Sequence, residues 1–140
     1  TIPYQPGVLR AVAFRDGGPA AEDTLTTTGS VHAIMLEPDR RELRADGMDL
    51  CYVGITLADK DGRRVYGEDR ELSAFLNGPG TLAGFGSNNP CTQENFGTGR
   101  RVTWNGRAML VLRAGHESGV LDLTVSAPGM STQLLRIRTV

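Results

Sequence analysis

The sequence predicts an all-β protein, a β-sandwich preceded by a β-hairpin. Apolar and polar residues alternate with a period of two in many short segments, which is the pattern of half-buried strands. Eighteen glycines and seven prolines interrupt these segments, at the spacing of roughly 8 to 12 residues that is typical of a sandwich. No segment carries the apolar stripe of an amphipathic helix over about ten residues. We therefore expect many short strands, tight turns and very little helix.

Residues 1–29 are predicted to form a hairpin with a leading turn at residues 5–7. The segment 8–14 alternates between two faces, and the segment 22–27 is rich in threonine, which favours strand geometry. Between them, Asp16-Gly17-Gly18 is a tight-turn signal because glycine accepts positive φ angles. A hairpin alone is marginally stable in water, so we expect this one to pack on something.

Residues 31–140 are predicted to form an immunoglobulin-like sandwich of roughly seven or eight strands. The clearest strand runs from Leu50 to Ala58, and one of its faces is entirely apolar. We assign that face to the core: Cys51, Val53, Ile55 and Leu57. The other strands are expected at 32–36, 72–76, 81–85, 102–104, 108–112, 120–126 and 134–140, with a short segment at 42–45.

Turn residues separate these strands. Asp59-Lys60-Asp61-Gly62 is expected to close a hairpin, and Asn105-Gly106 is the signature of a type I′ turn. Trp104 precedes that turn, where an aromatic side chain usually packs across the hairpin. The longest irregular stretch covers residues 86–99.

The charge pattern argues against a nucleic-acid or membrane partner. The formal net charge is −1, and basic and acidic residues are interspersed without a basic stripe. No apolar run approaches the roughly 20 residues of a membrane span. No secretory leader is visible, and the chain opens on Thr1 rather than Met. We therefore expect a mature, trimmed or excised polypeptide.

Few residues could hold a metal ion or form a disulfide. Cys51 lies in an alternating strand and Cys91 in an irregular loop, so one bridge is conceivable, but we favour a buried thiol and an unrelated loop thiol. Asp59 and Asp61 alone supply too few oxygens for calcium, and Asp46 lies at the far end of the intervening strand. We expect no metal site and no cofactor.

Catalytic residues are not expected in this chain either. Glu68, Asp69 and Glu71 are carboxylates of the type that glycosidases use, but they lie in a charged, solvated run. His32 and His116 are isolated, and no Gly-x-Ser-x-Gly element accompanies them.

Two sets of motifs resemble known families. Ala45-Asp46-Gly47 before the 50–58 strand, and the Asp-x-x-Gly turn after it, resemble bacterial immunoglobulin-like domains of the invasin type. The segment Tyr4–Phe14 resembles the Tyr-x-Pro-Gly-x-Leu-x-Ala-x-Ala sequence near the end of family 2 glycoside hydrolases, which include β-galactosidase-like and β-glucuronidase-like enzymes.

Further matches to the second family keep order and spacing over nearly all 140 residues. They are Thr26-Thr27-Thr28-Gly29, Asn77-Gly78-Pro79-Gly80, Leu82-Ala83-Gly84, Phe96, Arg100-Arg101 and Trp104-Asn105-Gly106-Arg107-Ala108. One departure is Ser87-Asn88-Asn89-Pro90, where the family usually has Asn-Gly-Asp-Pro.

The resemblance implies a non-catalytic C-terminal module of a β-galactosidase-like enzyme, with a role in supporting the catalytic domains, in interdomain packing or in an oligomer interface. Residues 1–29 would be the terminal strands of a truncated preceding immunoglobulin-like domain, and residues 31–140 the complete C-terminal one. The catalytic acid and nucleophile of such an enzyme, which hydrolyses O-glycosyl bonds, are two glutamates on an upstream barrel. Its implied partners are the upstream domains of the same polypeptide, and its implied location is periplasmic or extracellular. The exposed edges of residues 1–29 also predict self-association.

Two other readings stay open. The chain could be a stand-alone bacterial adhesion or surface module, although such an array should not carry the Tyr-x-Pro-Gly segment. It could also be an accessory carbohydrate-binding module. Within the irregular stretch, Asn88, Asn89, Glu94 and Asn95 are predicted to face the catalytic domain or rim its substrate cleft, because long polar loops often carry function.

Overall fold

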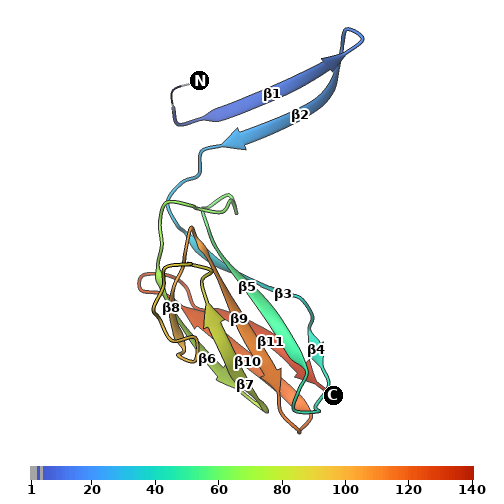
Figure 1. The fold of residues 1–140 in the computed structure, drawn as a ribbon, viewed down its shortest axis with the longest axis vertical. Coiled ribbons are helices and arrows are strands. Elements are labelled where there is room, and N and C mark those ends of the chain that lie inside the picture. The colour runs from blue at the N-terminus through green and yellow to red at the C-terminus, as the bar shows by residue number, and fades with distance from the viewer. Residues whose placement is uncertain (1–2, 4) are drawn as a thin grey trace.

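The computed structural model describes residues 3 and 5–140, and it contains a hairpin and a sandwich (Figure 1). Tyr4, on which part of the family resemblance depends, lies outside the described residues, as do residues 1 and 2 of the predicted hairpin region. The described part of the chain contains no helix, as the sequence predicts. No helix there is long and apolar enough to cross a membrane.

The hairpin consists of β1 (Val8–Arg15) and β2 (Gly18–Thr26). Asp16 and Gly17 both have positive φ angles, 52° and 78°, which is the geometry of a type I′ turn. Val8 lies opposite Thr26, and a bulge between Ala13 and Phe14 shifts the register near the tip. Figure 1 shows the hairpin standing away from one end of the sandwich, joined to it by a short connection.

Among the residues that the structure describes, nine strands form the sandwich, whereas the sequence predicted roughly seven or eight. One sheet has the order β4-β11-β10-β6-β8 and the other β3-β5-β9-β7. All pairings are antiparallel except that of β4 with β11. Their bounds are β3 (Ala33–Pro38), β4 (Glu42–Leu43), β5 (Leu50–Ala58), β6 (Glu71–Asn77), β7 (Gly80–Gly86), β8 (Arg100–Val102), β9 (Arg107–Ala114), β10 (Gly119–Ser126) and β11 (Gln133–Thr139).

The core lies between the two sheets, where the sequence placed it. The predicted apolar face of β5 is buried, with every member at most 1% exposed: Cys51, Val53, Ile55 and Leu57. From the opposite sheet, β10 contributes Leu121, Leu123 and Val125, which are fully buried. Truncating any one of the core leucines to alanine should cost about 2 to 5 kcal/mol of stability.

The expected turn at residues 59–62 forms, but the hairpin that it closes is short, with one antiparallel bridge. Gly62 donates its amide to the Asp59 carbonyl at 3.0 Å, so the turn itself forms. Beyond it, only one bridge joins Ala58 to Arg64, and the next strand, β6, belongs to the other sheet. The turn at 105–106 likewise connects β8 and β9 of different sheets, although Trp104 and Arg107 form a bridge across it. Turn residues determine where the chain reverses, but the choice of sheet depends on packing.

Both cysteines are free thiols, as favoured from the sequence. Cys51 is buried, and its Sγ donates to the Arg40 carbonyl oxygen at 3.3 Å. Burial raises the pKa of this thiol to about 11. Cys91 is exposed in the irregular loop.

Candidate functional site

Two regions outside the core carry features that packing alone does not require. The first is the junction, which we define as the hairpin base, the connection at residues 27–32 and the segment 59–66. The second is the loop at residues 87–98 with its anchor on β8.

At the junction, one carboxylate ties the hairpin connection to the sandwich. Asp59 Oδ2 accepts a hydrogen bond from the Gly29 amide at 3.1 Å. Its Oδ1 accepts from the amides of Asp61 and Arg63, each at 2.9 Å. These amide bonds, that of Arg63 foremost, lower the pKa of Asp59. The side chain that the sequence assigned to turn chemistry therefore also fixes the point where the hairpin leaves the sandwich.

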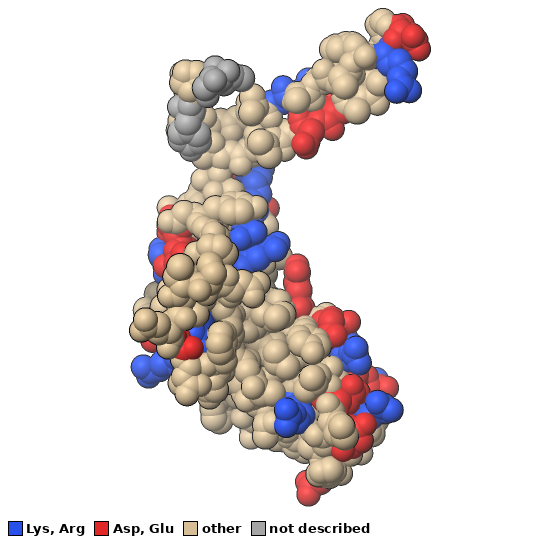
Figure 2. Space-filling model, viewed as in Figure 1, with Lys and Arg blue, Asp and Glu red and all other residues tan. Residues whose placement is uncertain are grey.

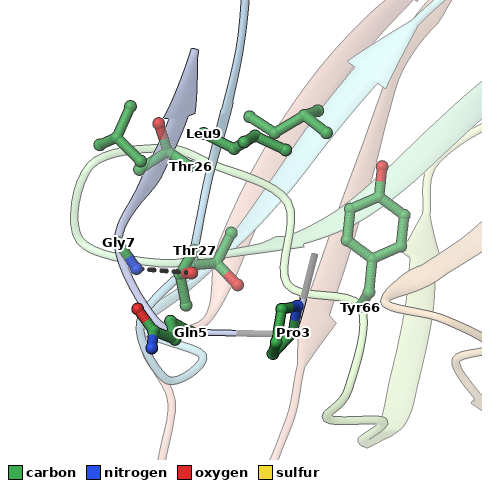
Figure 3. Close-up of a pocket in the computed structure, with 10 residues that line it drawn as sticks. Pro3, Gln5, Gly7, Leu9, Thr26, Thr27 and Tyr66 are labelled. Atoms are coloured by element: carbon green, nitrogen blue, oxygen red, sulfur yellow. Dashed lines mark hydrogen bonds between the residues drawn. The ribbon is translucent and has the colours of Figure 1, made fainter. Parts of the chain in front are cut away.

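The hairpin base is closed by two bonds between the leading turn and the connection. The Gly7 amide donates to Thr27 Oγ1 at 3.0 Å, and the Thr27 amide donates to the Gly7 carbonyl at 2.9 Å. A hollow of about 600 Å³ lies beside this base, with Tyr66 on the sandwich side (Figure 3). The Arg64 guanidinium lies 4.2 Å from the centre of the Tyr66 ring, which is a cation–π distance.

Large apolar side chains remain exposed on the hairpin itself. Leu9 lies directly opposite Leu25 on one face, and these side chains are 52% and 67% exposed. Val8 and Phe14, from the same strand β1, are 66% and 70% exposed. Figure 2 shows that uncharged atoms dominate the hairpin surface between the charged residues of its tip and edge. Large exposed apolar side chains on so regular a hairpin mark a surface that another protein element covers.

The 87–98 loop is organised by a buried arginine, Arg101. Its Nε donates to the Phe85 carbonyl at 2.9 Å, its Nη1 to Glu94 Oε2 at 2.6 Å and its Nη2 to the Asn95 carbonyl at 2.8 Å. Register places Arg101 opposite the core residue Leu72, so its side chain points inward and has 0% exposure. The rigid fork of a guanidinium suits such a set of diverging acceptors.

The four loop residues that the sequence singled out fall into two pairs. Glu94 pairs with Arg101, which lowers the pKa of Glu94, and it also accepts a bond from Thr92 Oγ1 at 3.0 Å. Asn95 Oδ1 accepts from the Gly97 amide at 2.8 Å, so this pair serves the loop itself.

Asn88 and Asn89 lie elsewhere, at the edge of a hollow of about 330 Å³ on the sheet surface. Asn88 has a φ of 61°, and Asn89 Oδ1 accepts from the Cys91 amide at 3.0 Å. That any of the four residues faces a catalytic domain or substrate cleft stays a prediction.

The charged run at 67–71 has a structural role that the sequence interpretation missed. Asp69 Oδ1 accepts bonds from Thr103 Oγ1 and the Gly106 amide, both at 2.9 Å, and so holds the type I′ turn. Glu68 pairs with Arg70 at 2.6 Å. The sequence did hold a signal for burial of Arg101 and Thr103, because they occupy alternate positions of β8 and its extension that face the core. Among described residues, no group of three or more potential metal ligands occurs.

Comparison with known proteins identifies relatives over the whole chain. Residues 34–136 match the family described as glycoside hydrolase family 2 C-terminal domain 5. The chain is 30% identical over 136 residues to the beta-galactosidase BoGH2A of Bacteroides ovatus, covering 97% of this chain and 16% of that protein. It thus spans about a sixth of the length of that relative.

Solved structures agree with this match. A glycosyl hydrolase family 2 member from Bacteroides cellulosilyticus superposes with a TM-score of 0.95 at 34% identity, over 99% of this chain and 18% of that one. The adhesin InvE of Yersinia pseudotuberculosis has a TM-score of 0.52 at 22% identity, over 76% of this chain and 26% of that one. The second likeness concerns the fold alone, and it agrees with the invasin-type turn motifs. The first includes the hairpin and its position on the sandwich.

Proposed function

Because this chain belongs to the C-terminal domains of glycoside hydrolase family 2, we propose that it is the non-catalytic tail of a β-galactosidase-like enzyme and supports the domain before it. The observation that carries the proposal is the hairpin. Its apolar residues are exposed, yet its position on the sandwich recurs in a far longer solved chain of the family. Residues that stay exposed in so regular an element indicate a missing neighbour.

In this proposal, residues 1–29 complete a preceding immunoglobulin-like domain and residues 31–140 form a domain of their own. Both outer edges of the β1–β2 ribbon carry unpaired backbone groups, which can extend a sheet of that preceding domain. Leu9 and Leu25 then enter its core. The Asp59 bond to Gly29 sets the angle between the two domains, because it fixes the connection at the sandwich surface.

The same open edges predict what the chain does when it is separated from its parent. We propose that hairpins of different copies pair with one another, since unpaired strand edges with apolar faces associate readily. Light scattering should then show a mass that rises with protein concentration. A monodisperse monomer whose hairpin is disordered by NMR would contradict this.

The supporting role is tested in the full-length parent enzyme. Leu25→Asp, which places a charge on the covered face, should lower the unfolding temperature of the enzyme by several degrees, since burying an unpaired charge is costly. The Michaelis constant of the enzyme that remains folded should not change. The matched control is Thr24→Asp, one residue away on the opposite face. Equal stability for both variants and the parent would refute the proposal.

No observation favours an adhesion function, because the likeness to the adhesin extends only to the fold. Export of the parent enzyme stays a prediction, which fractionation of the producing cells would check.

A further inference from the structure

The hollow beside Asn88 and Asn89 exists because two residues of β7 at its floor are glycines, which have no side chains to fill it. It lies on the outer face of the four-stranded sheet, over β7 and β9. Register places Gly86 opposite Met109 and Gly84 opposite Val111. Because the glycines have no side chains, the flank of each apolar neighbour is open, and Met109 remains 39% exposed. The result is a shallow apolar trough, and the 87–98 loop lies at one end of it.

Phe96 forms the wall of this trough, and it is held in place. Its carbonyl accepts the Phe85 amide at 2.8 Å, which attaches the loop to β7. Its ring lies against Gly86, where an added Cβ would come within 3.1 Å of the ring. The Arg101 guanidinium is 5.0 Å from the ring centre. Even so, Phe96 is 56% exposed. An aromatic ring that is exposed but already immobilised loses little entropy when it binds a ligand.

The polar groups at the rim are amides. Asn89 is fixed through Oδ1 by the Cys91 amide, which leaves its NH₂ group with donors for another partner. Asn88 is exposed and carries both a donor and an acceptor. None of the described residues that line the hollow is charged. A volume of about 330 Å³ is within the range of small-molecule sites.

We propose that this hollow binds one or two units of a neutral sugar. The apolar floor and the Phe96 ring match the C–H face of a pyranose, and the asparagine amides match its hydroxyl groups. The described residues that line the hollow offer no cation to pair with a carboxylate, so an anionic sugar should bind more weakly. The site is separate from the junction, so it does not depend on the supporting role proposed above.

The experiment is an NMR titration of the 140-residue chain with lactose and cellobiose, and with glucuronic acid as the anionic comparison. We expect saturable shifts of backbone amides in residues 84–89, 96 and 109–111, with a dissociation constant of about 1 mM. Glucuronic acid should bind at least about tenfold more weakly. Phe96→Ala should weaken binding of the neutral sugars by about tenfold or more.

Matched variants separate the hollow from other exposed aromatic residues. Phe75→Ala, on the outer face of the opposite sheet, and Trp104→Ala should bind as the unmodified chain does. Asn89→Asp is a second test of the same site, for the case in which Phe96→Ala disturbs the loop. It adds a negative charge without removing bulk, and it should also weaken binding of the neutral sugars. No shifts with either sugar at about 20 mM, shifts located elsewhere, or loss of binding in the Phe75 or Trp104 variant would each overturn the proposal.

Discussion

Replacing Arg101 by methionine should be among the most damaging single changes in the 87–98 region. The side chain is buried and donates to the carbonyl of Phe85 in β7, to the carbonyl of Asn95 and to the carboxylate of Glu94. Methionine fills similar volume but leaves the Phe85 carbonyl without that partner, which costs about 1 to 3 kcal/mol. Loss of the two loop bonds adds about 1 kcal/mol each. Glu94 is half exposed, so water can solvate it and no further penalty applies.

The expected total is therefore about 3 to 5 kcal/mol, a large part of the stability of a domain of this size. Urea unfolding of the 140-residue chain, followed by far-UV circular dichroism, measures it. The control is Arg100→Met, one residue away on the exposed face, whose contact with Glu71 is long at 3.9 Å. That variant should stay within about 0.5 kcal/mol of the parent. A cost for Arg101→Met no greater than for Arg100→Met would refute the assignment of Arg101 as the anchor of the loop.

Three further predictions concern the junction, a turn and the thiols. Asp59→Ala should lower the urea midpoint at pH 7. Because amide bonds depress the pKa of Asp59, its contribution to stability is complete above about pH 4 and is lost as the pH falls through the lower pKa of the folded state. The urea midpoints of the variant and the parent should therefore converge only in acid. Gly106→Ala should cost more than about 1 kcal/mol of stability, since φ is 70° and the added Cβ would overlap a carbonyl oxygen. Gly62→Ala should cost less, because φ is 78° but the space around the added Cβ is open. Equal losses of stability would refute the steric argument. Ellman's reagent at pH 8 should modify Cys91 within minutes and leave Cys51 unmodified, because burial raises the pKa of Cys51 to about 11. Rapid reaction of both thiols would contradict the burial of Cys51.

Local patterns were the part of the fold that could be predicted. The bounds of β5 and its buried face follow from strict alternation over nine residues. The turns at Asp16-Gly17 and Asn105-Gly106 follow from residues that tolerate positive φ. The assignment of strands to sheets was less accessible, because the turn at 59–62 has hairpin residues but leads across the sandwich. That choice depends on contacts between segments far apart in sequence.

The loop was predicted as a region but not in its detail. The burial of Arg101 was not predicted from the sequence. Three acceptors from two segments converge on Arg101 and allow its burial. Asn88 and Asn89 were selected as polar loop residues, but the trough beside them depends on glycines and apolar residues of β7 and β9, which are distant in sequence. Only the three-dimensional register brings those groups together.

In the proposed role, residues 1–29 belong structurally to the domain before the sandwich. Amide hydrogen exchange measured on this chain alone and on the full-length enzyme tests it most directly. We expect amides at the outer edges of β1 and β2 to exchange rapidly in the isolated chain and at least about a hundredfold more slowly in the enzyme. Amides of β5 should exchange at similar rates in both. Equally rapid exchange of the hairpin edges in both proteins would contradict the account.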